Sequence, residues 1–280
     1  MTGWCNVCGW EGEFLNPERD REGMQCGNCS ASSRHRAVVR ALGLVLDHGA
    51  LPLCLWPSWK EIRVLESSAR GPVPMMLKEK VDYYATEYDP AKIAAGTHPR
   101  EYADFQKLHY TDNTFDLVIA SDVFEHVRDD RSGYREIFRV LKEGGTLVLT
   151  VPYEHERMET IRRVDTSGAE DLHLLEPEYH GGGGHTLTYR NYGRDLLPLL
   201  QSSGYAVTRV VVDLPAWGIT GQSVFVARKG SWVELHDHVP AGIRRTGTGP
   251  LLPFRAFLFY KYNLLSVVHH LRQIIKAGSR

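Results

Sequence analysis

Four cysteines near the start of the chain have the spacing of a metal site. Cys5 and Cys8 form one C-x-x-C pair, and Cys26 and Cys29 form a second. Such pairs are typical of a four-thiolate zinc site, in which four protein ligands leave no position open for water or substrate. We therefore expect a structural zinc ion, which would supply folding energy that a short ribbon cannot gain from a core. Two disulfides are the alternative, which an oxidising compartment would favour.

Basic residues follow the second cysteine pair at the start of a predicted helix. Ser33-Arg34-His35-Arg36 precedes apolar residues at helical spacing between Val38 and Leu46. Either a solvated helix start or a set of donors facing the sulfurs is favoured over phosphate contact, because a short charge cluster is usually a polar face. Cys54 stands among apolar residues and is predicted to be a buried hydrophobe rather than a nucleophile.

Two apolar strands around one helix are predicted near the middle of the chain. The run Leu117–Ala120 is apolar on successive residues, as expected of a central parallel strand. Apolar spacing predicts a helix over residues 134–142 with Gly144-Gly145 as its stop, and Thr146–Val151 predicts the next strand. Strand, helix and strand form a βαβ unit, and ligands of such sheets bind at the carboxyl ends of the strands.

Two further strands are predicted upstream, over residues 62–66 and 81–87. Glu87 lies about twenty residues after Glu66, where doubly wound folds place an acid on the ribose hydroxyls of a nucleotide. A carboxylate suits this role because it accepts hydrogen bonds from both hydroxyls. Asp89 is a competing candidate, which could instead cap the turn that follows it.

Several motifs resemble those of the class I S-adenosylmethionine-dependent methyltransferases. They are the acid-small-x-x-Leu loop at Asp104, the Phe-Asp-x-Val strand at Phe115, Glu125-His126-Val127, and Leu141-Lys142-x-Gly144-Gly145. The resemblance implies an α/β fold with a doubly wound Rossmann-like methyltransferase sheet, beside a small N-terminal zinc ribbon with four cysteine ligands. It also implies S-adenosylmethionine as cofactor, with Asp104 on the adenine amino group and the Phe105 backbone beside the ring.

The turn after the first strand departs from this family. There the family carries an acid followed by a Gly-x-Gly-x-Gly run, which lets the backbone approach the methionine portion of the cofactor. Glu66 keeps the acid and Gly71 keeps one glycine, whereas Ser67 is a small residue that preserves close approach. The resemblance thus gives these cofactor-binding candidates: Glu66, Ser67, Gly71, Glu87, Asp104, Phe105 and Ser121.

A narrower resemblance is to bacterial methyltransferase-domain proteins with an N-terminal zinc ribbon. It is carried by Cys5–Trp10, by the Leu-Glu-Ser-Ser stretch at Leu65, and by Glu178–Gly181 with Leu187–Tyr189, and it extends to about residue 230. It implies a zinc ribbon over residues 1–36 and a methyltransferase domain over 37–230. Within that domain, a helix is predicted from residue 191 to 200 and a strand pair over 205–212 and 223–227.

An irregular insertion over about residues 153–190 is where the methyl acceptor should bind, because substrate loops follow the carboxyl ends of strands. His155, His180 and His185 are candidate general bases, since histidine titrates near neutrality. Each is alternatively a surface or structural histidine, and alignment of the acceptor alone can suffice for methyl transfer. His126 is interpreted as structural. The glycine run 181–184 favours a lid or hairpin.

The C-terminal extension, residues 231–280, holds an aromatic-rich amphipathic segment over 251–275. Arg255 and Lys261 interrupt it, which argues against a membrane-spanning helix. Packing onto the domain or onto a partner, including a second copy, is favoured over attachment to a membrane surface.

Composition limits the choice of function. The 280-residue chain has a formal net charge of −1, so its bulk electrostatics favour neither nucleic acid nor an anionic membrane. No signal sequence or apolar spanning run is evident, so a cytoplasmic location is expected. We expect a methyltransferase acting on a small molecule or sugar in a biosynthetic pathway, by O- or N-methylation. The alternatives are an RNA or protein methyltransferase recruited through the ribbon, and a non-catalytic binding module suggested by the altered glycine turn.

Overall fold

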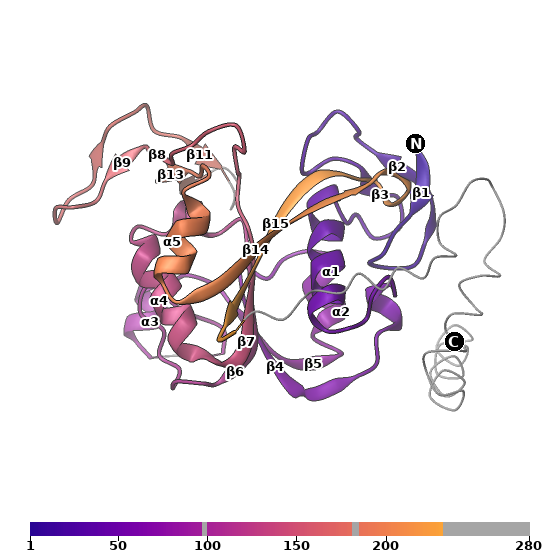
Figure 1. Ribbon diagram of the computed structural model, residues 1–280, viewed down its shortest axis with the longest axis horizontal. Helices are drawn as coiled ribbons and strands as arrows, with labels where there is room; N and C mark the ends of the chain where they lie inside the picture. The colour runs from indigo at the N-terminus through magenta and orange to yellow at the C-terminus, as the bar shows by residue number, and fades with distance from the viewer. Residues whose placement is uncertain (97–99, 181–184, 232–280) are drawn as a thin grey trace. The chain divides into compact units, whose positions relative to one another are not determined.

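A six-stranded mixed sheet forms the centre of the protein in the computed structural model (Figure 1). The structure describes residues 1–96, 100–180 and 185–231. The strand order is β14-β15-β7-β6-β4-β5, in which β4 to β7 are parallel and β15 is antiparallel to both its neighbours. The strands are β4 (Trp59–Ser67), β5 (Val81–Thr86), β6 (Phe115–Ser121), β7 (Leu141–Thr150), β14 (Tyr205–Leu214) and β15 (Ile219–Lys229).

Helices cover both faces of this sheet. Figure 1 shows α1 and α2 on one side and α4 and α5 on the other, so the predicted doubly wound α/β fold is confirmed. The α-helices are α1 (Ser33–Val45), α2 (Pro72–Leu77), α3 (Pro90–Ala94), α4 (Asp130–Val140) and α5 (Leu196–Ser202). Within the described residues, three short 3-10 helices accompany them: η1 (Leu53–Leu55), η2 (Phe124–His126) and η3 (Pro215–Trp217).

The central strand β6 is apolar because both its faces are covered. Each residue of its run Leu117–Ala120 is at most 1% exposed. Val118 pairs with Leu65 of β4 on one side and with Leu147 of β7 on the other. Burying such side chains stabilises the fold by about 1.5–3 kcal/mol each. The parallel pairing carries the ends of β4, β5 and β6 to one edge of the sheet, where their polar residues meet.

Two helix boundaries differ from the sequence prediction. Helix α4 ends at Val140, and Gly144-Gly145 lies inside β7 rather than at a helix stop. The reason is that Leu141 already pairs with Phe115 of β6, after which a bulge holds Lys142 against Asp116 at 2.8 Å. Helix α5 begins at Leu196, not at residue 191, because the preceding residues pair with the insertion.

Short strands make up much of the remaining described structure. The ribbon forms a three-stranded sheet of β1 (Thr2–Trp4), β2 (Glu11–Leu15) and β3 (Gln25–Cys26). The insertion forms three two-stranded pairs: β8 (Ile161–Arg162) with β13 (Arg190–Asn191), β9 (Val164–Asp165) with β10 (Leu172–His173), and β11 (Tyr179–His180) with β12 (Thr186–Leu187).

Several predictions fall outside the described residues or stay open. The glycine run 181–184 and the amphipathic segment 251–275 lie outside the described residues. The strand pair over 205–212 and 223–227 is confirmed, and it extends into β14 and β15. The domain boundaries at residues 36 and 230 and the insertion bounds of 153–190 remain predictions.

Candidate cofactor site and cysteine cluster

The four ribbon cysteines converge on one point. The Cys5 and Cys29 sulfurs lie 3.8 Å apart, those of Cys8 and Cys26 lie 3.7 Å apart, and all four Sγ atoms lie within 4.8 Å of one another. Four sulfurs at about 2.3 Å from a zinc ion in a tetrahedron would be about 3.8 Å apart. A disulfide requires about 2.05 Å, so the donor set fits one zinc ion held by four thiolates rather than two bridges.

Arg36 joins this ribbon to the rest of the protein. It is fully buried, and its guanidinium donates hydrogen bonds to the carbonyls of Met24, Ala31 and Gly218. A solvated position at the helix start is therefore wrong for Arg36, whereas the donor interpretation is closer, because the cysteines interact electrostatically with this side chain. Cys54 is half-buried, and burial raises the pKa of its thiol to about 11, which disfavours a nucleophilic thiolate.

A cavity of ≈ 240 Å³ opens beyond the carboxyl ends of β4 and β6. This is the edge where ligands of parallel α/β sheets bind. It is lined by Arg34, His35, Val38, Glu66, Ser68, Arg70, Gly71, Val73 and Ser121. Glu66, Gly71 and Ser121 of the predicted cofactor set thus share one cavity, and sequence reasoning missed its wall from α1.

Glu66 is the buried acid of this cavity. Its residue is 5% exposed, and its carboxylate accepts a hydrogen bond from the Tyr83 hydroxyl of β5. Burial raises the pKa of Glu66 to about 7, against the opposing effect of Tyr83 and Arg34. A cationic ligand group would compensate for burying this carboxylate, so the acid fits an ammonium-bearing ligand.

The turn after β4 uses a left-handed conformation without the family's glycine run. Ser68 adopts φ 54° and its amide donates to the Thr86 carbonyl at 2.8 Å. Gly71 has φ 91° and precedes α2, and a Cβ there would lie 3.4 Å from Nε2 of His35. Ser67, also predicted as a cofactor residue, is a buried strand residue that pairs with Ala120.

Glu87 follows β5, and its carboxylate lies 3.2 Å from Nε of Arg70, a residue that lines the cavity. Asp89 accepts hydrogen bonds from the amides of Ala91 and Lys92 and caps α3, which is the alternative role that its sequence position suggested. A parallel β-bridge between Glu87 and Tyr102 brings the segment around Tyr102 to the same edge of the sheet. Glu87 therefore lies beside the cavity, and its ribose role remains a prediction.

Asp104 follows Tyr102, the bridge partner of Glu87, in the chain. Its carboxylate accepts hydrogen bonds from the backbone and side-chain nitrogens of Gln106, at 2.8 and 3.1 Å. These bonds stabilise the loop that carries Asp104. It also acts electrostatically on Tyr88, next to Glu87. The Phe105 side chain is buried against Phe124 in the core, which leaves the backbone at this position for ligand contact. The adenine roles of both residues remain predictions.

Helix α1 brings two side chains to the cavity. Arg34 donates to the Ser121 hydroxyl and lies 3.1 Å from Asp122, so the expected solvated position is wrong for Arg34 too. His35 caps the helix with Ser32, whose amide donates to Nδ1 of the ring at 3.1 Å. Burial lowers the pKa of His35 to about 4, so the ring is neutral with its hydrogen on Nε2, facing Gly71.

The three candidate base histidines occupy different surroundings. His155 is 61% exposed and pairs with Glu156 at 2.8 Å, while His185 is exposed before β12. His180 lies with Glu125 and His126, whose ligand-type atoms all fall within 4.8 Å of one another. The structure thus brings one of the three to the cavity side of β6, and the catalytic role of each remains a prediction.

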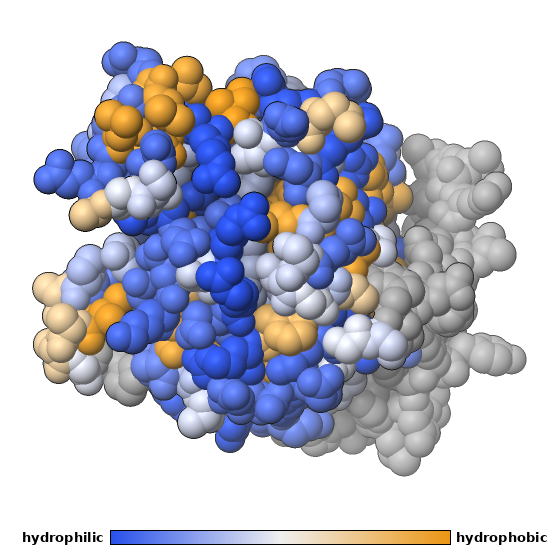
Figure 2. Space-filling model, turned by 60° about the vertical axis from the view of Figure 1, so that its left-hand side comes forward, coloured by the Kyte–Doolittle hydropathy of each residue, from blue (hydrophilic) through white to orange (hydrophobic). Residues whose placement is uncertain are grey.

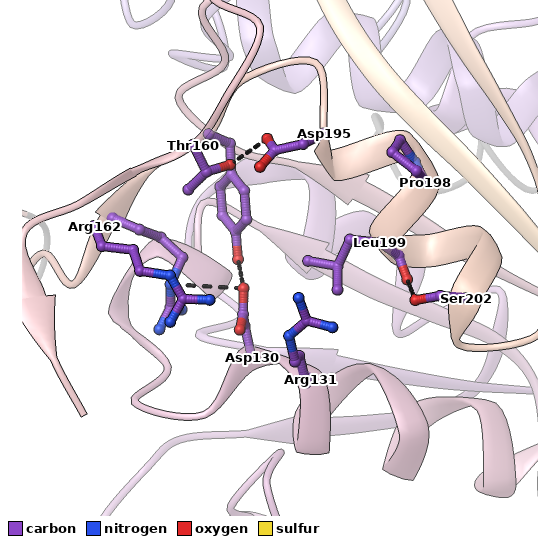
Figure 3. Close-up of a pocket in the computed structure, with 10 residues that line it drawn as sticks. Asp130, Arg131, Thr160, Arg162, Asp195, Pro198, Leu199 and Ser202 are labelled. Carbon is purple, nitrogen blue, oxygen red and sulfur yellow. Dashed lines mark hydrogen bonds and ion pairs between the residues drawn. The ribbon is translucent and has the colours of Figure 1, made fainter. Parts of the chain in front are cut away.

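A second cavity, of ≈ 300 Å³, lies between α4, the insertion and α5 (Figure 3). Its acids are engaged by neighbours, since Asp130 accepts from the Tyr192 hydroxyl at 2.8 Å and Asp195 accepts from Thr160 at 2.6 Å. These bonds tie the insertion to α4 and α5, which indicates a supporting role for this region.

Exposed apolar side chains gather in the insertion. Met158, Leu172, Leu174, Leu175 and Tyr179 are all at least 44% exposed. In Figure 2 a large apolar patch lies at the upper left of a largely hydrophilic face, and smaller apolar patches lie elsewhere on that face. Among the described residues, no helix is long and apolar enough to cross a membrane.

The doubly wound sheet, its terminal antiparallel strand pair and the cavity at its carboxyl edge define a class I methyltransferase fold. Residues 71–149 match the family model described as a methyltransferase domain. Residues 71–149 therefore carry a methyltransferase domain, and a four-cysteine cluster lies near the N-terminus of the chain.

Curated relatives match over short segments. The chain is 37% identical over 68 residues to a demethylmenaquinone methyltransferase of Corynebacterium efficiens, covering 23% of this chain and 30% of the relative. It is 46% identical over 50 residues to cycloartenol-C-24-methyltransferase 1 of Oryza sativa subsp. japonica, covering 18% of this chain and 14% of the relative. The chain thus spans less than a third of the length of these relatives.

Solved structures match over more of the chain at lower identity. An S-adenosylmethionine-dependent methyltransferase from Mesorhizobium loti is 16% identical with a TM-score of 0.42, over 71% of this chain and 98% of that one. The CMeT domain of a citrinin polyketide synthase is 17% identical with a TM-score of 0.41, over 72% of this chain and 53% of that one.

Proposed function

We propose that this protein is an S-adenosylmethionine-dependent methyltransferase that acts on a small-molecule acceptor. The observation that supports the proposal best is the cavity at the carboxyl edge of β4 and β6, because it is lined by the buried acid Glu66, which the family resemblance predicts to bind the cofactor. When bound, the cofactor supplies an electrophilic methyl group on a sulfonium.

The residues of the cavity suit the two charged groups at the methionine end of the cofactor. Glu66 offers a buried carboxylate for the ammonium group, and the Nε2 hydrogen of His35 offers a donor for the carboxylate. Glu87 and Asp104 extend the site along the same edge, for the ribose and the adenine respectively. The chain thus binds and orients the cofactor with side chains from α1, β4 and the segments after β5.

A small acceptor is supported by the curated relatives, whose names state demethylmenaquinone, phosphoethanolamine and sterol. The formal net charge of −1 gives no excess of basic residues for tracking phosphates, which disfavours RNA as the acceptor. The insertion carries exposed apolar residues that would face such an acceptor's hydrocarbon portion. We place methylation on oxygen or nitrogen and the reaction in biosynthesis.

Zinc in the four-cysteine cluster would be structural. Four thiolates close its coordination sphere, so the ion would hold the ribbon rather than take part in methyl transfer. We place the protein in the cytoplasm, where reduced thiols are available for zinc.

Isothermal titration with S-adenosylmethionine and S-adenosylhomocysteine tests the proposal. Wild-type protein should bind both, and Glu87→Ala should weaken binding by about 10- to 100-fold, as expected when charged hydrogen bonds worth about 1.5–3 kcal/mol are lost. Glu61→Ala is the matched control, because Glu61 is an exposed acid in the opposite half of β4 and should leave affinity unchanged. Failure of the folded, zinc-loaded wild type to bind either compound would leave a non-catalytic module.

A further inference from the structure

A buried carboxylate without a hydrogen-bond partner lies just beyond the cofactor cavity. Glu125 is 0% exposed, and neither of its carboxylate oxygens has a hydrogen-bond partner among the described residues. Leaving a buried acid in this state costs several kcal/mol in a folded protein, so such a group usually has a ligand or a function. Burial raises the pKa of Glu125 in this environment.

Two histidines point their ring nitrogens at this carboxylate. Nε2 of His126 lies 3.9 Å from Oε1 of Glu125, and Nε2 of His180 lies 3.7 Å from the same oxygen. Both distances are too long for hydrogen bonds. A metal ion at about 2.0–2.2 Å from each ligand atom spans pairs about 4 Å apart, which fits both histidine–carboxylate distances. The ligand-type atoms of all three side chains lie within 4.8 Å of one another, so they gather around one position.

The other nitrogen of each ring has a neighbour of its own, and for His126 this neighbour fixes the tautomer. Nδ1 of His126 donates to the Leu187 carbonyl at 2.8 Å, because a carbonyl oxygen can only accept. Nδ1 of His180 lies 3.4 Å from the Glu178 carboxylate and 3.2 Å from the Thr188 hydroxyl. With its hydrogen on Nδ1, His126 directs the Nε2 lone pair toward Glu125. His180 would do the same in the tautomer whose Nδ1 hydrogen faces the Glu178 carboxylate. Carbonyl or carboxylate acceptors behind metal-binding histidines are the usual arrangement in proteins.

The cluster is also held rigidly. Arg190 is buried and donates to the carbonyl of Phe124 at 2.8 Å and to that of Arg128 at 2.8 Å. The Tyr189 amide donates to the Glu125 carbonyl at 2.8 Å. The insertion therefore fixes the backbone of η2, and with it both ligands that η2 carries.

We propose that Glu125, His126 and His180 bind a divalent first-row transition-metal ion beside the cofactor cavity. Two imidazoles and one carboxylate suit such ions, and three protein ligands leave coordination positions open. The site adjoins the cavity because Ser121, which lines it, ends the strand before η2, and because Arg34 acts electrostatically with Glu125. Asp122, the neighbouring acid, is already paired with Arg21 at 2.9 Å and is not included.

The open positions would take a hydroxyl group of the acceptor, an assignment that rests on the proposed methyltransferase function. A hydroxyl on a divalent cation loses its proton to solvent more readily. Its oxygen then forms the bond to the methyl carbon while the carbon–sulfur bond breaks and its electron pair stays on sulfur. This selects oxygen rather than nitrogen as the methylated atom.

Manganese and zinc are the probes for the site. Protein that already holds one zinc equivalent in the ribbon is titrated with Mn²⁺, and the free ion is followed by its electron paramagnetic resonance signal. Thiolates are poor ligands for Mn²⁺, so the ribbon should not compete. Wild type should bind one Mn²⁺ per chain, and a second zinc equivalent should displace it.

Two variants locate the ion. Glu125→Gln and His180→Asn should each weaken Mn²⁺ binding by more than tenfold and abolish the rise in melting temperature that Mn²⁺ causes in wild type. His173→Asn, an exposed histidine of the same insertion, is the matched control and should bind like wild type. Because glutamine keeps the shape of the side chain and has no charge to bury, that variant should remain folded without metal, which separates loss of a ligand from loss of structure.

Either of two results would overturn the site. One is wild-type protein that binds neither ion beyond the ribbon's equivalent, and the other is undiminished binding in both variants. Titration of the same proteins with S-adenosylhomocysteine separates this proposal from the previous one. The metal site stands if Mn²⁺ binds and the cofactor does not, whereas retained cofactor binding without Mn²⁺ overturns the metal site alone.

Discussion

Cofactor affinity should depend on pH through Glu66. The carboxyl is 5% exposed, and burial raises its pKa to about 7. If the cofactor's ammonium pairs with the ionised form, only the ionised fraction of the protein binds well. That fraction is about 3% at pH 5.5 and about 24% at pH 6.5 for a pKa near 7. The dissociation constant should therefore fall about eightfold between these two values, and flatten above pH 7.

Other groups at the cavity do not explain such a change. Burial lowers the pKa of His35 to about 4, so its ring stays neutral in this window. The ammonium of the cofactor stays charged, because α-amino groups titrate near about 7.7–8.0. Binding should lower the pKa of Glu66 toward its ordinary value, so about 0.7 proton should be released per cofactor at pH 6.5.

Isothermal titration in buffers with different ionisation enthalpies measures this proton release directly. Glu66→Gln should bind more weakly, release no proton and show no dependence on pH from about 5.5 to 6.5. The folding stability of the same variant tests whether the pKa of Glu66 is raised in the folded protein. Because the folded pKa lies above the unfolded value, Glu66 stabilises the fold below about pH 4.5, and this contribution is lost as the pH rises through about 7. Glu66→Gln should thus be more stable than wild type at about pH 8, by up to about 3 kcal/mol. Equal proton release in wild type and variant would refute the assignment of Glu66.

Four further substitutions test the framework around the site. Cys26→Ser should lose the bound zinc and lower the melting temperature, as measured by metal analysis and calorimetry, whereas unchanged zinc content would contradict the four-cysteine assignment. Gly204→Ala should cost about 1–3 kcal/mol by denaturant unfolding, because Gly204 has φ 101° and a Cβ would lie 2.9 Å from the Phe138 ring. Gly221→Ala, with φ 56° and open space, should cost only about 1 kcal/mol. Tyr192→Phe removes a buried hydroxyl that donates to Asp130 at 2.8 Å and should cost about 1–3 kcal/mol; a change below about 0.5 kcal/mol would argue against that bond.

The elements that sequence reasoning located best have strong local signals. The run Leu117–Ala120 is apolar because it is covered on both faces, and β6 contains it. Cysteine spacing predicts the ribbon for a similar reason, since each C-x-x-C pair is a local chelating unit. Apolar residues at helical spacing predict helix α4 but not the residue at which it ends. The Gly144-Gly145 signal is overridden because Leu141 pairs with β6, and such pairing depends on a distant strand.

The candidate site is harder to predict because its members come from distant segments. Tyr83 reaches Glu66 only through the parallel register of β4 and β5, which could have suggested the contact once both strands were assigned. Nothing in the local pattern separates Glu125 from an exposed helix-start acid, although it is fully buried. For the same reason the sequence favours a structural interpretation of His126. Its neighbour His180 lies far along the chain, on a two-residue strand with no periodicity to detect.

Ion pairs tie the ribbon to the helix start that lines the cavity at the sheet edge. Arg34, which lines that cavity, pairs with Glu22 of the ribbon and with Asp122 after β6. Arg21 of the ribbon also pairs with Asp122, at 2.9 Å, and together the two arginines hold the pKa of Asp122 low against the effect of burial. Displacing the ribbon would therefore remove Arg21 from Asp122 and Glu22 from Arg34, and would change the charge balance at this edge of the cavity. The position of His35 depends on the same helix start, so a zinc ion that closes the ribbon would also keep the cavity in shape for its ligand.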